Sequence, residues 1–290
     1  MFAKSVLLSI VLSFVNQPAP AGGFESLQGF NTAVISQINR VVGSENLPLA
    51  MGLPVEPGVY VAVSPERITI FDRNVATVAN GAVKDPMAGE FESGKFAKGV
   101  GNECRSGCSR PVYDGFHDTW RRLVRESRTI GSDIPSRVLI GANASLPARL
   151  LVDTAYAATE SRPTLPPSLF LLLNGGQAGL RARPFVILPP DGLLLSPGQR
   201  ALGLTIKLEA NGSFVVTAAD PRFGRTLTYS SQQELGLALR DIKKRYPSKE
   251  TMIVDVREAG TVDDVVQLMV LAQDHFPNVV LTTGQPVRVG

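Results

Sequence analysis

Residues 226–283 decide the fold, and they read TLTYSSQQELGLALRDIKKRYPSKETMIVDVREAGTVDDVVQLMVLAQDHFPNVVLTT. Two segments in this stretch have apolar residues at helical spacing, and each is preceded by the pattern of a capping box. The capping pairs are Ser231 with Glu234 and Thr261 with Asp264. Two short apolar runs, Met252–Val256 and Val279–Thr283, follow the helices and are typical of strands. The stretch therefore predicts an α-β-α-β unit.

A predicted β-hairpin precedes this unit. Leu204–Ala210 and Ser213–Ala219 flank Asn211-Gly212, the strongest short-range hairpin signal. Further upstream, the same order occurs again: the strands Tyr60–Val63 and Ile68–Phe71 form a predicted hairpin, and a second α-β-α-β pattern ends at Leu173.

The two α-β-α-β patterns can be aligned. Arg137–Ala142 matches Thr251–Val256, and Leu169–Leu173 matches Val279–Thr283. A repeat of this length indicates a duplicated domain, since the repeats of solenoid proteins are about 20–50 residues long. We expect an α+β fold of two tandem modules, each a hairpin followed by α-β-α-β, with the helices on one face of a mixed sheet.

The predicted organisation of the whole chain follows from these patterns. Its parts are a signal peptide (1–21), an N-terminal helix and linker (22–58), module 1 with a long Gly- and Cys-containing insertion (59–180), a linker (181–200) and module 2 (201–290). Within the second part, apolar residues at helical spacing predict a helix over Ser26–Val42. In module 1, Asn74–Arg110 shows little periodicity and is interpreted as a surface excursion, after which a helix over Asp114–Thr129 is expected. Ser145 is the predicted N-cap of a second helix, Leu146–Ala158, and Phe185–Leu188, between Pro184 and Pro189, is a predicted edge strand.

The N-terminus has the pattern of a secretory signal peptide. Lys4 is followed by an apolar run, Ser5–Val15, and small residues in Ala19–Ala21 provide a cleavage site. The run is too short to span a bilayer as a helix, which needs about 20 residues. We expect a periplasmic protein.

Export bears on the two cysteines. Cys104 and Cys108 are expected to form a disulfide in an oxidising compartment. The alternative is a metal site of Cys104, Cys108 and His117, completed by Asp114 or Asp118 and belonging to a secreted hydrolase.

The net charge of +3 with 19% charged residues does not indicate nucleic-acid binding. The sequence contains no Gly-x-Ser-x-Gly elbow, phosphate loop or His-Glu-x-x-His motif. We therefore expect no enzyme activity and no cofactor.

Module 2 resembles the periplasmic domain of the ExbD/TolR family of biopolymer-transport proteins. The resemblance lies in the hairpin Leu204–Val216, the helix Ser231–Arg245 and the run Met252–Met269, in which a strand with a late acidic residue leads to a capped helix. The family's single transmembrane helix carries an aspartate for proton flow, whereas the apolar run here has no acidic residue. The resemblance therefore implies binding of peptidoglycan or envelope protein partners, as a homodimer or an internal pseudo-dimer, and not the proton-carrying role.

Two features are candidates for partner binding. Arginines recur within one predicted helix at positions suited to an acidic ligand, although a solvated helix face has the same pattern. They are Arg121, Arg122, Arg125 and Arg128. The other candidate is Asp255, the late acidic residue of the strand Met252–Val256.

Overall fold

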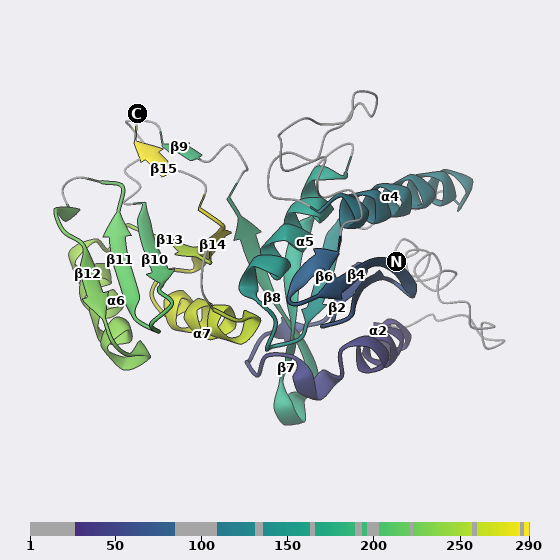
Figure 1. Cartoon of the computed structure of the whole chain (residues 1–290), viewed down its shortest axis with the longest axis horizontal. Helices are drawn as coiled ribbons and strands as arrows, with labels where there is room; N and C mark the ends of the chain where they lie inside the picture. Colours follow the sequence, from purple (N-terminus) through teal and green to yellow (C-terminus); the bar gives the residue numbers. More distant parts are fainter. Residues whose placement is uncertain are drawn as a thin grey trace. The chain divides into compact units, whose positions relative to one another are not determined.

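A computed structural model describes residues 27–84, 109–130, 136–162, 166–188, 193–195, 203–220, 223–256, 260–284 and 287–289 (Figure 1). The predicted signal peptide and both cysteines lie outside these ranges. The chain divides into two compact units, unit 1 of Met1–Leu146 and Asp153–Pro184 and unit 2 of Pro147–Val152 and Phe185–Gly290. Among the described residues, no helix is both long and apolar enough to cross a membrane.

Unit 1 is built on a mixed sheet. Its strands lie in the order β5 (Ala82–Lys84), β4 (Arg73–Ala79), β3 (Arg67–Ile70), β2 (Val59–Val63), β6 (Arg137–Ala142), β7 (Ser168–Asn174) and β8 (Leu180–Ile187), and the short β1 (Leu53–Pro54) pairs with β8. β6 runs parallel to β2 and β7, whereas β2, β3, β4 and β5 are connected as antiparallel neighbours.

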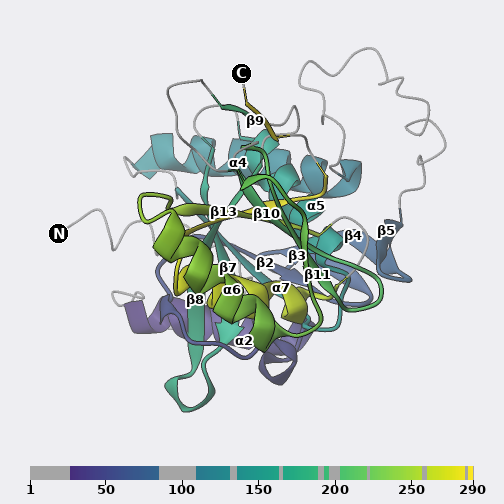
Figure 2. The ribbon, with the colours of Figure 1, turned by 90° about the vertical axis from the view of Figure 1, so that its left-hand side faces the viewer.

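Helices cover both faces of the unit 1 sheet. Figure 2 shows α4 (Arg110–Ile130) and α5 (Ala148–Glu160) on one side and α2 (Leu27–Val41) on the other. Every residue of β2 is buried as a result. α2 comes close to the sheet at Gly141, because a Cβ there would lie 2.5 Å from the Cδ1 atom of Ile38. The predicted N-terminal helix is thus confirmed, and it packs on unit 1.

Unit 2 has a mixed sheet of its own. Its strands lie in the order β12 (Leu227–Tyr229), β11 (Phe214–Ala218), β10 (Leu204–Leu208), β13 (Thr251–Asp255) and β14 (Asn278–Thr282), followed by the C-terminal end of β8. A separate parallel pair joins β9 (Leu193–Leu195) to β15 (Val287–Val289). The predicted α+β class with a mixed sheet is confirmed.

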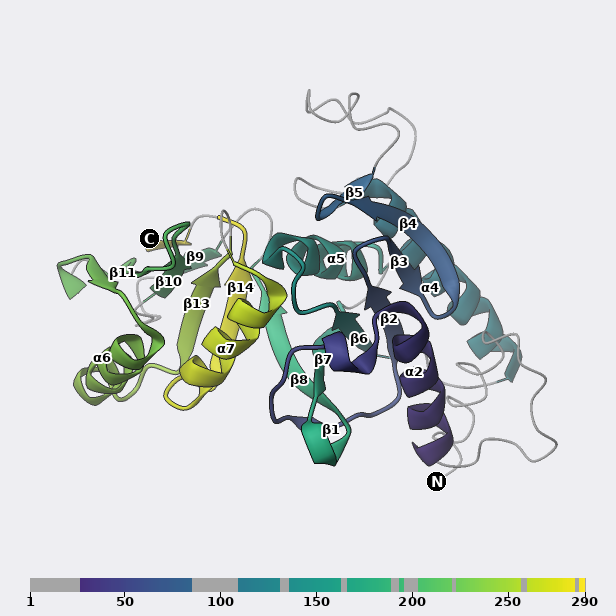
Figure 3. The ribbon, with the colours of Figure 1, turned by 60° about the horizontal axis from the view of Figure 1, so that its bottom comes forward.

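The helices of unit 2 lie on one side of its sheet. Figure 3 shows α6 (Gln232–Arg245) and α7 (Val262–Gln273) together on that side. Burial alternates along β10 accordingly: Leu204 and Ile206 are buried, whereas Thr205 and Lys207 are half-buried. This alternation is typical of a strand with one covered face.

The caps of α6 and α7 are close to the predicted ones. The Thr261 side chain accepts a hydrogen bond from the backbone N–H of Asp264, and the Asp264 carboxylate accepts one from the N–H of Thr261. At α6, Ser231 caps the helix as predicted, but the Glu234 carboxylate accepts hydrogen bonds from the N–H and hydroxyl groups of Ser230. These hydrogen bonds lower the pKa of Glu234.

The two units have the same strand order around equivalent parallel ladders. β2 pairs with β3 and β6, and β6 with β7, while β10 pairs with β11 and β13, and β13 with β14. The registers correspond to the alignment of the repeat, because Val138 pairs with Leu169 and Met252 pairs with Val279.

Several local predictions are wrong. The predicted excursion Asn74–Arg110 begins with β4 and β5, which are joined at Asn80-Gly81 with positive φ at both residues. Ser145 does not begin a helix, since α5 starts at Ala148 and the Ser145 hydroxyl donates to the Asn143 side chain. The edge strand predicted at Phe185–Leu188 corresponds to the end of β8, but β8 begins earlier, at Leu180, and continues through Pro184.

Two helical glycines provide a matched test of helix packing. A Cβ at Gly115 of α4 would lie 2.7 Å from the Cβ atom of Val75 on β4, whereas at Gly236 of α6 it would lie 2.9 Å from the Cδ1 tip of Leu271. Both changes to alanine gain about 1 kcal/mol of helix propensity. We expect G236A to stabilise the protein by up to about 1 kcal/mol. We expect G115A to destabilise it, because overpacking costs about 1–3 kcal/mol and a strand Cβ cannot rotate aside.

Thermal and urea denaturation of the full chain measures both effects. A G115A protein as stable as the wild type would show that α4 does not depend on its close approach to β4.

Candidate anion-binding site

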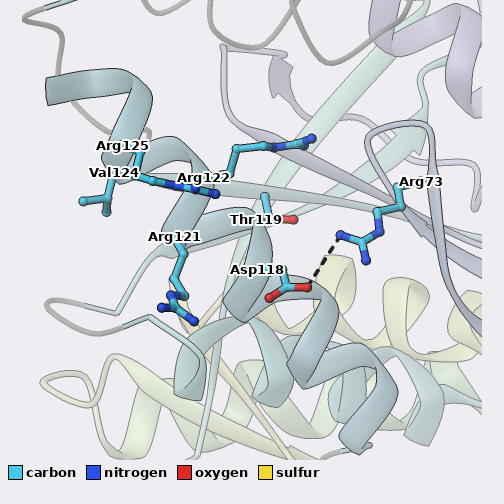
Figure 4. A pocket seen from close by; sticks show the side chains of 7 residues that line it. All are labelled: Arg73, Asp118, Thr119, Arg121, Arg122, Val124 and Arg125. Carbon is cyan, nitrogen blue, oxygen red and sulfur yellow. Dashed lines mark ion pairs between the residues drawn. The ribbon is translucent and has the colours of Figure 1, made fainter. Parts of the chain in front are cut away.

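A pocket of about 620 Å³ lies in unit 1, where α4 passes β4 (Figure 4). Four arginines and one aspartate are among the residues that line it, and we name it the arginine pocket. Its lining residues are Arg73, Asp118, Thr119, Arg121, Arg122, Val124 and Arg125. The volume is within the range of ligand pockets, about 300–1,000 Å³.

The amphipathic sequence of α4 places these side chains. Phe116, Trp120 and Leu123 recur at helical spacing and are buried in unit 1. This orientation leaves Arg121 and Arg125 exposed on the outer side of the helix, and Arg122 half-buried between the two faces. Arg122 therefore lies at the border of the apolar face, and Arg121 and Arg125 lie on the solvent side of the helix.

α4 and β4 come into close contact one turn before the residues that line the pocket. Gly115 allows α4 to approach Val75 of β4. One turn later, the buried Thr119 hydroxyl donates to the Gly115 carbonyl over 2.8 Å. The Thr119 hydroxyl proton is thus used within the helix, and the cationic side chains supply the recognition chemistry of the pocket.

One ion pair joins the two elements. Arg73 of β4 and Asp118 of α4 face each other, with Nη1 and Oδ2 3.7 Å apart (Figure 4). Their side chains are 59% and 55% exposed. An ion pair this accessible to water contributes only about 0–1 kcal/mol, so Arg73 can exchange its partner at little cost.

Burial affects the charged groups beside the pocket. It is the main cause that lowers the pKa of Arg122, and the positive charges of Arg73 and Arg125 lower it further, against the opposing effects of Glu126 and Asp72. Burial also raises the pKa of Glu126, against the effects of Arg122 and Arg125. A bound anion would favour the charged form of Arg122.

The arrangement suits an acidic ligand. Guanidinium groups bind carboxylates and phosphates through pairs of parallel hydrogen bonds. Figure 4 shows Arg122 extending toward the side of α4 on which Arg73 lies, whereas Val124 points to the opposite side and Arg121 toward the bottom of the view. Arg73, Arg122 and Arg125 are accordingly the principal candidates for ligand contact.

The structure brings together three of the four arginines singled out in the sequence. Arg121, Arg122 and Arg125 line the pocket, and Arg128 is exposed on α4 outside the lining. Asp255 lies in unit 2, 4% exposed at the end of β13, with Lys207 and Thr282 as its ladder neighbours. It is a buried residue of the sheet and does not belong to the pocket.

The predicted disulfide and metal site fall on Cys104 and Cys108, outside the described residues. His117, the third residue of the metal hypothesis, lies on α4 with its ring stacked on Tyr113, the ring centroids 6.1 Å apart. Within the described ranges, no group of three His, Cys, Asp or Glu side chains is placed to hold a metal ion.

Sequence reasoning missed Arg73 as a site residue. It begins β4, whose remaining residues fall in the segment Asn74–Arg110 that was expected to be an irregular excursion, and it lies 45 positions before Asp118. The Asn80-Gly81 turn is the signal that could have identified β4, since it marks a hairpin. Nothing in the sequence indicates that this hairpin lies beside α4.

We expect R125A to weaken binding of citrate, used as a small acidic probe, by about tenfold or more, since a hydrogen bond to a charged group contributes about 1.5–3 kcal/mol. R128A removes the same charge from the same helix outside the lining, and we expect it to change the affinity less than about threefold. Isothermal titration calorimetry at low salt measures both. Equal losses in the two variants would mean that citrate responds to net charge and not to the pocket.

No protein-family model matches the chain, and no curated protein or solved structure is significantly similar to it. The residues and geometry of the arginine pocket are therefore the basis on which a function is proposed.

Proposed function

We propose that this chain is a non-enzymatic periplasmic component of an ExbD/TolR-like envelope transport or motility complex, and that it binds peptidoglycan through the arginine pocket. The observation that carries the proposal is the concentration of four arginines and one aspartate around a pocket of about 620 Å³. Such a surface recognises acidic groups.

Peptidoglycan has the matching chemistry. Its peptide stems carry free carboxylates, which are planar and accept two parallel hydrogen bonds from one guanidinium group. Because the stems repeat along a polymer, many weak contacts between wall and protein can add up by avidity. An acidic surface of an envelope protein is the other ligand with this chemistry, and the experiment below distinguishes it from the wall.

The fold adds support from the shared topology of the units. Each contains a hairpin followed by α-β-α-β, the order expected of the ExbD/TolR periplasmic domain. In unit 2, the late acidic residue Asp255 ends β13, and Thr261 caps the next helix, α7. The periplasmic location in this proposal rests on the sequence pattern of a signal peptide, and association as a homodimer or internal pseudo-dimer rests on the resemblance.

Co-sedimentation with purified peptidoglycan sacculi tests the proposal. We expect the chain from Gly22 to Gly290 to bind saturably, and binding to weaken as salt is raised because charges are screened. The double variant R122A/R125A is expected to lose at least about tenfold in affinity, whereas R128A binds like the wild type. Melting temperatures of the variants control for folding.

Absence of binding by the wild-type protein would contradict the wall as ligand. Crosslinking in the envelope would then search for an acidic protein partner, with R122A/R125A as the matched negative control. If sacculi bind the wild type and R122A/R125A equally, the wall contact lies outside the arginine pocket.

A further inference from the structure

We propose that Asp118 is an internal competitor for the ligand of the arginine pocket, so that the pocket selects ligands with two or more carboxylates over single carboxylates. This inference rests on the proposed function, because it takes the pocket to be the binding site of an acidic ligand.

Asp118 is in the position that a ligand carboxylate would take. It is the one carboxylate among the residues that line the described pocket, and its Oδ2 atom is 3.7 Å from Nη1 of Arg73. Arg73 is also the one lining residue from β4, since the other six belong to α4. A ligand that bridges the two elements therefore meets Asp118 as a competitor for Arg73.

Asp118 competes with a ligand carboxylate for Arg73, but only weakly. A carboxylate held on the same chain has a high effective concentration at Arg73, which a free monocarboxylate at low concentration cannot match. More than half of both side chains is exposed, so water and salt screen the pair and it can be broken. Asp118 thus weakens the binding of a single carboxylate at Arg73 by the few-fold that an exposed ion pair contributes, without closing the pocket.

A ligand with several carboxylates overcomes this competition. One acidic group can bind Arg122 and Arg125 on α4, whereas the ion pair of Asp118 is with Arg73. A second carboxylate of the bound ligand then competes with Asp118 for Arg73. Because the ligand is already held at α4, the effective concentration of this carboxylate is similar to that of Asp118. The pocket of about 620 Å³ has room for such a molecule. The ligand class is therefore a polycarboxylate, such as an oligomeric acidic peptide.

The test compares citrate with acetate on the full chain by isothermal titration calorimetry, with acetate measured by displacement. We expect citrate to bind the wild type at least about 100-fold more tightly than acetate. We expect D118N to tighten citrate binding about three- to fivefold, the change equivalent to removing an exposed ion pair.

D114N is the matched control. Asp114 lies one turn earlier on α4, is similarly exposed and also pairs with an arginine, Arg110, but it does not line the pocket. Its substitution removes the same charge from the same helix, so we expect citrate affinity to change less than about twofold. In an R73A background the effect of D118N should fall to that of D114N, because Asp118 then has no guanidinium for which to compete.

Each contrary result overturns a specific claim. Equal effects of D118N and D114N would reduce the role of Asp118 to general electrostatics and end the competitor model. Acetate and citrate affinities within about tenfold would overturn the selectivity for polycarboxylates. In both of these cases, if the wild type binds citrate and R122A/R125A does not, the pocket remains an anion site and the proposed function stands. Failure of all variants to bind citrate would overturn both the inference and the pocket as an anion site.

Discussion

The parallel pairing of β6 with β2 is the constraint on which the arrangement of unit 1 depends. Parallel neighbours cannot be joined by a tight turn, so the chain must cross over one face of the sheet before it returns as β6. The crossover ends with α4, which packs on β3 and β4. Its apolar stripe faces the sheet, and Arg121, Arg122 and Arg125 then line the same pocket as Arg73 of β4. The arginine pocket is thus a consequence of strand order, because the helix that completes a parallel connection brings its arginines close to Arg73 of the antiparallel strands.

Elements with strong local signals were predictable from the sequence. The buried runs Val138–Ala142 and Leu169–Leu173 have few polar residues because other elements surround them. The predicted ends of these strands agree with those of β6 and β7 to within one residue. The capping box Thr261–Asp264 was equally clear, since it satisfies backbone N–H groups that a helix start leaves open. Errors occurred where signals conflicted. Ser145 has the chemistry of a cap, but its hydroxyl hydrogen-bonds the Asn143 side chain and α5 begins later.

The pocket itself could be predicted only in part. The spacing of Arg121, Arg122 and Arg125 identifies a cationic border on one helix, because helical periodicity is a local property. Arg73 joins them through a contact between elements far apart in sequence, and that contact depends on the absence of a side chain at Gly115. In the sequence, a glycine within a helix indicates only a low helix propensity. It does not indicate that a strand packs against the helix at that residue. The arginines of α4 could therefore be predicted from local sequence, whereas the Arg73–Asp118 pair depends on how α4 and β4 pack in the folded unit.

The shared topology of the units shows how one of them differs in chemistry. Val61 pairs with Ile70 in unit 1, and Ile206 pairs with Val216 in unit 2. The next ladder then pairs Ile70 with Arg73 and Val216 with Leu227. Leu227 therefore stands in unit 2 where unit 1 has Arg73. In addition, β4 extends over seven residues and β12 over three. The equivalent strand position thus holds an arginine beside the crossover helix in unit 1 and an apolar residue in unit 2. The proposed recognition of an acidic ligand by strand and helix together is therefore assigned to unit 1.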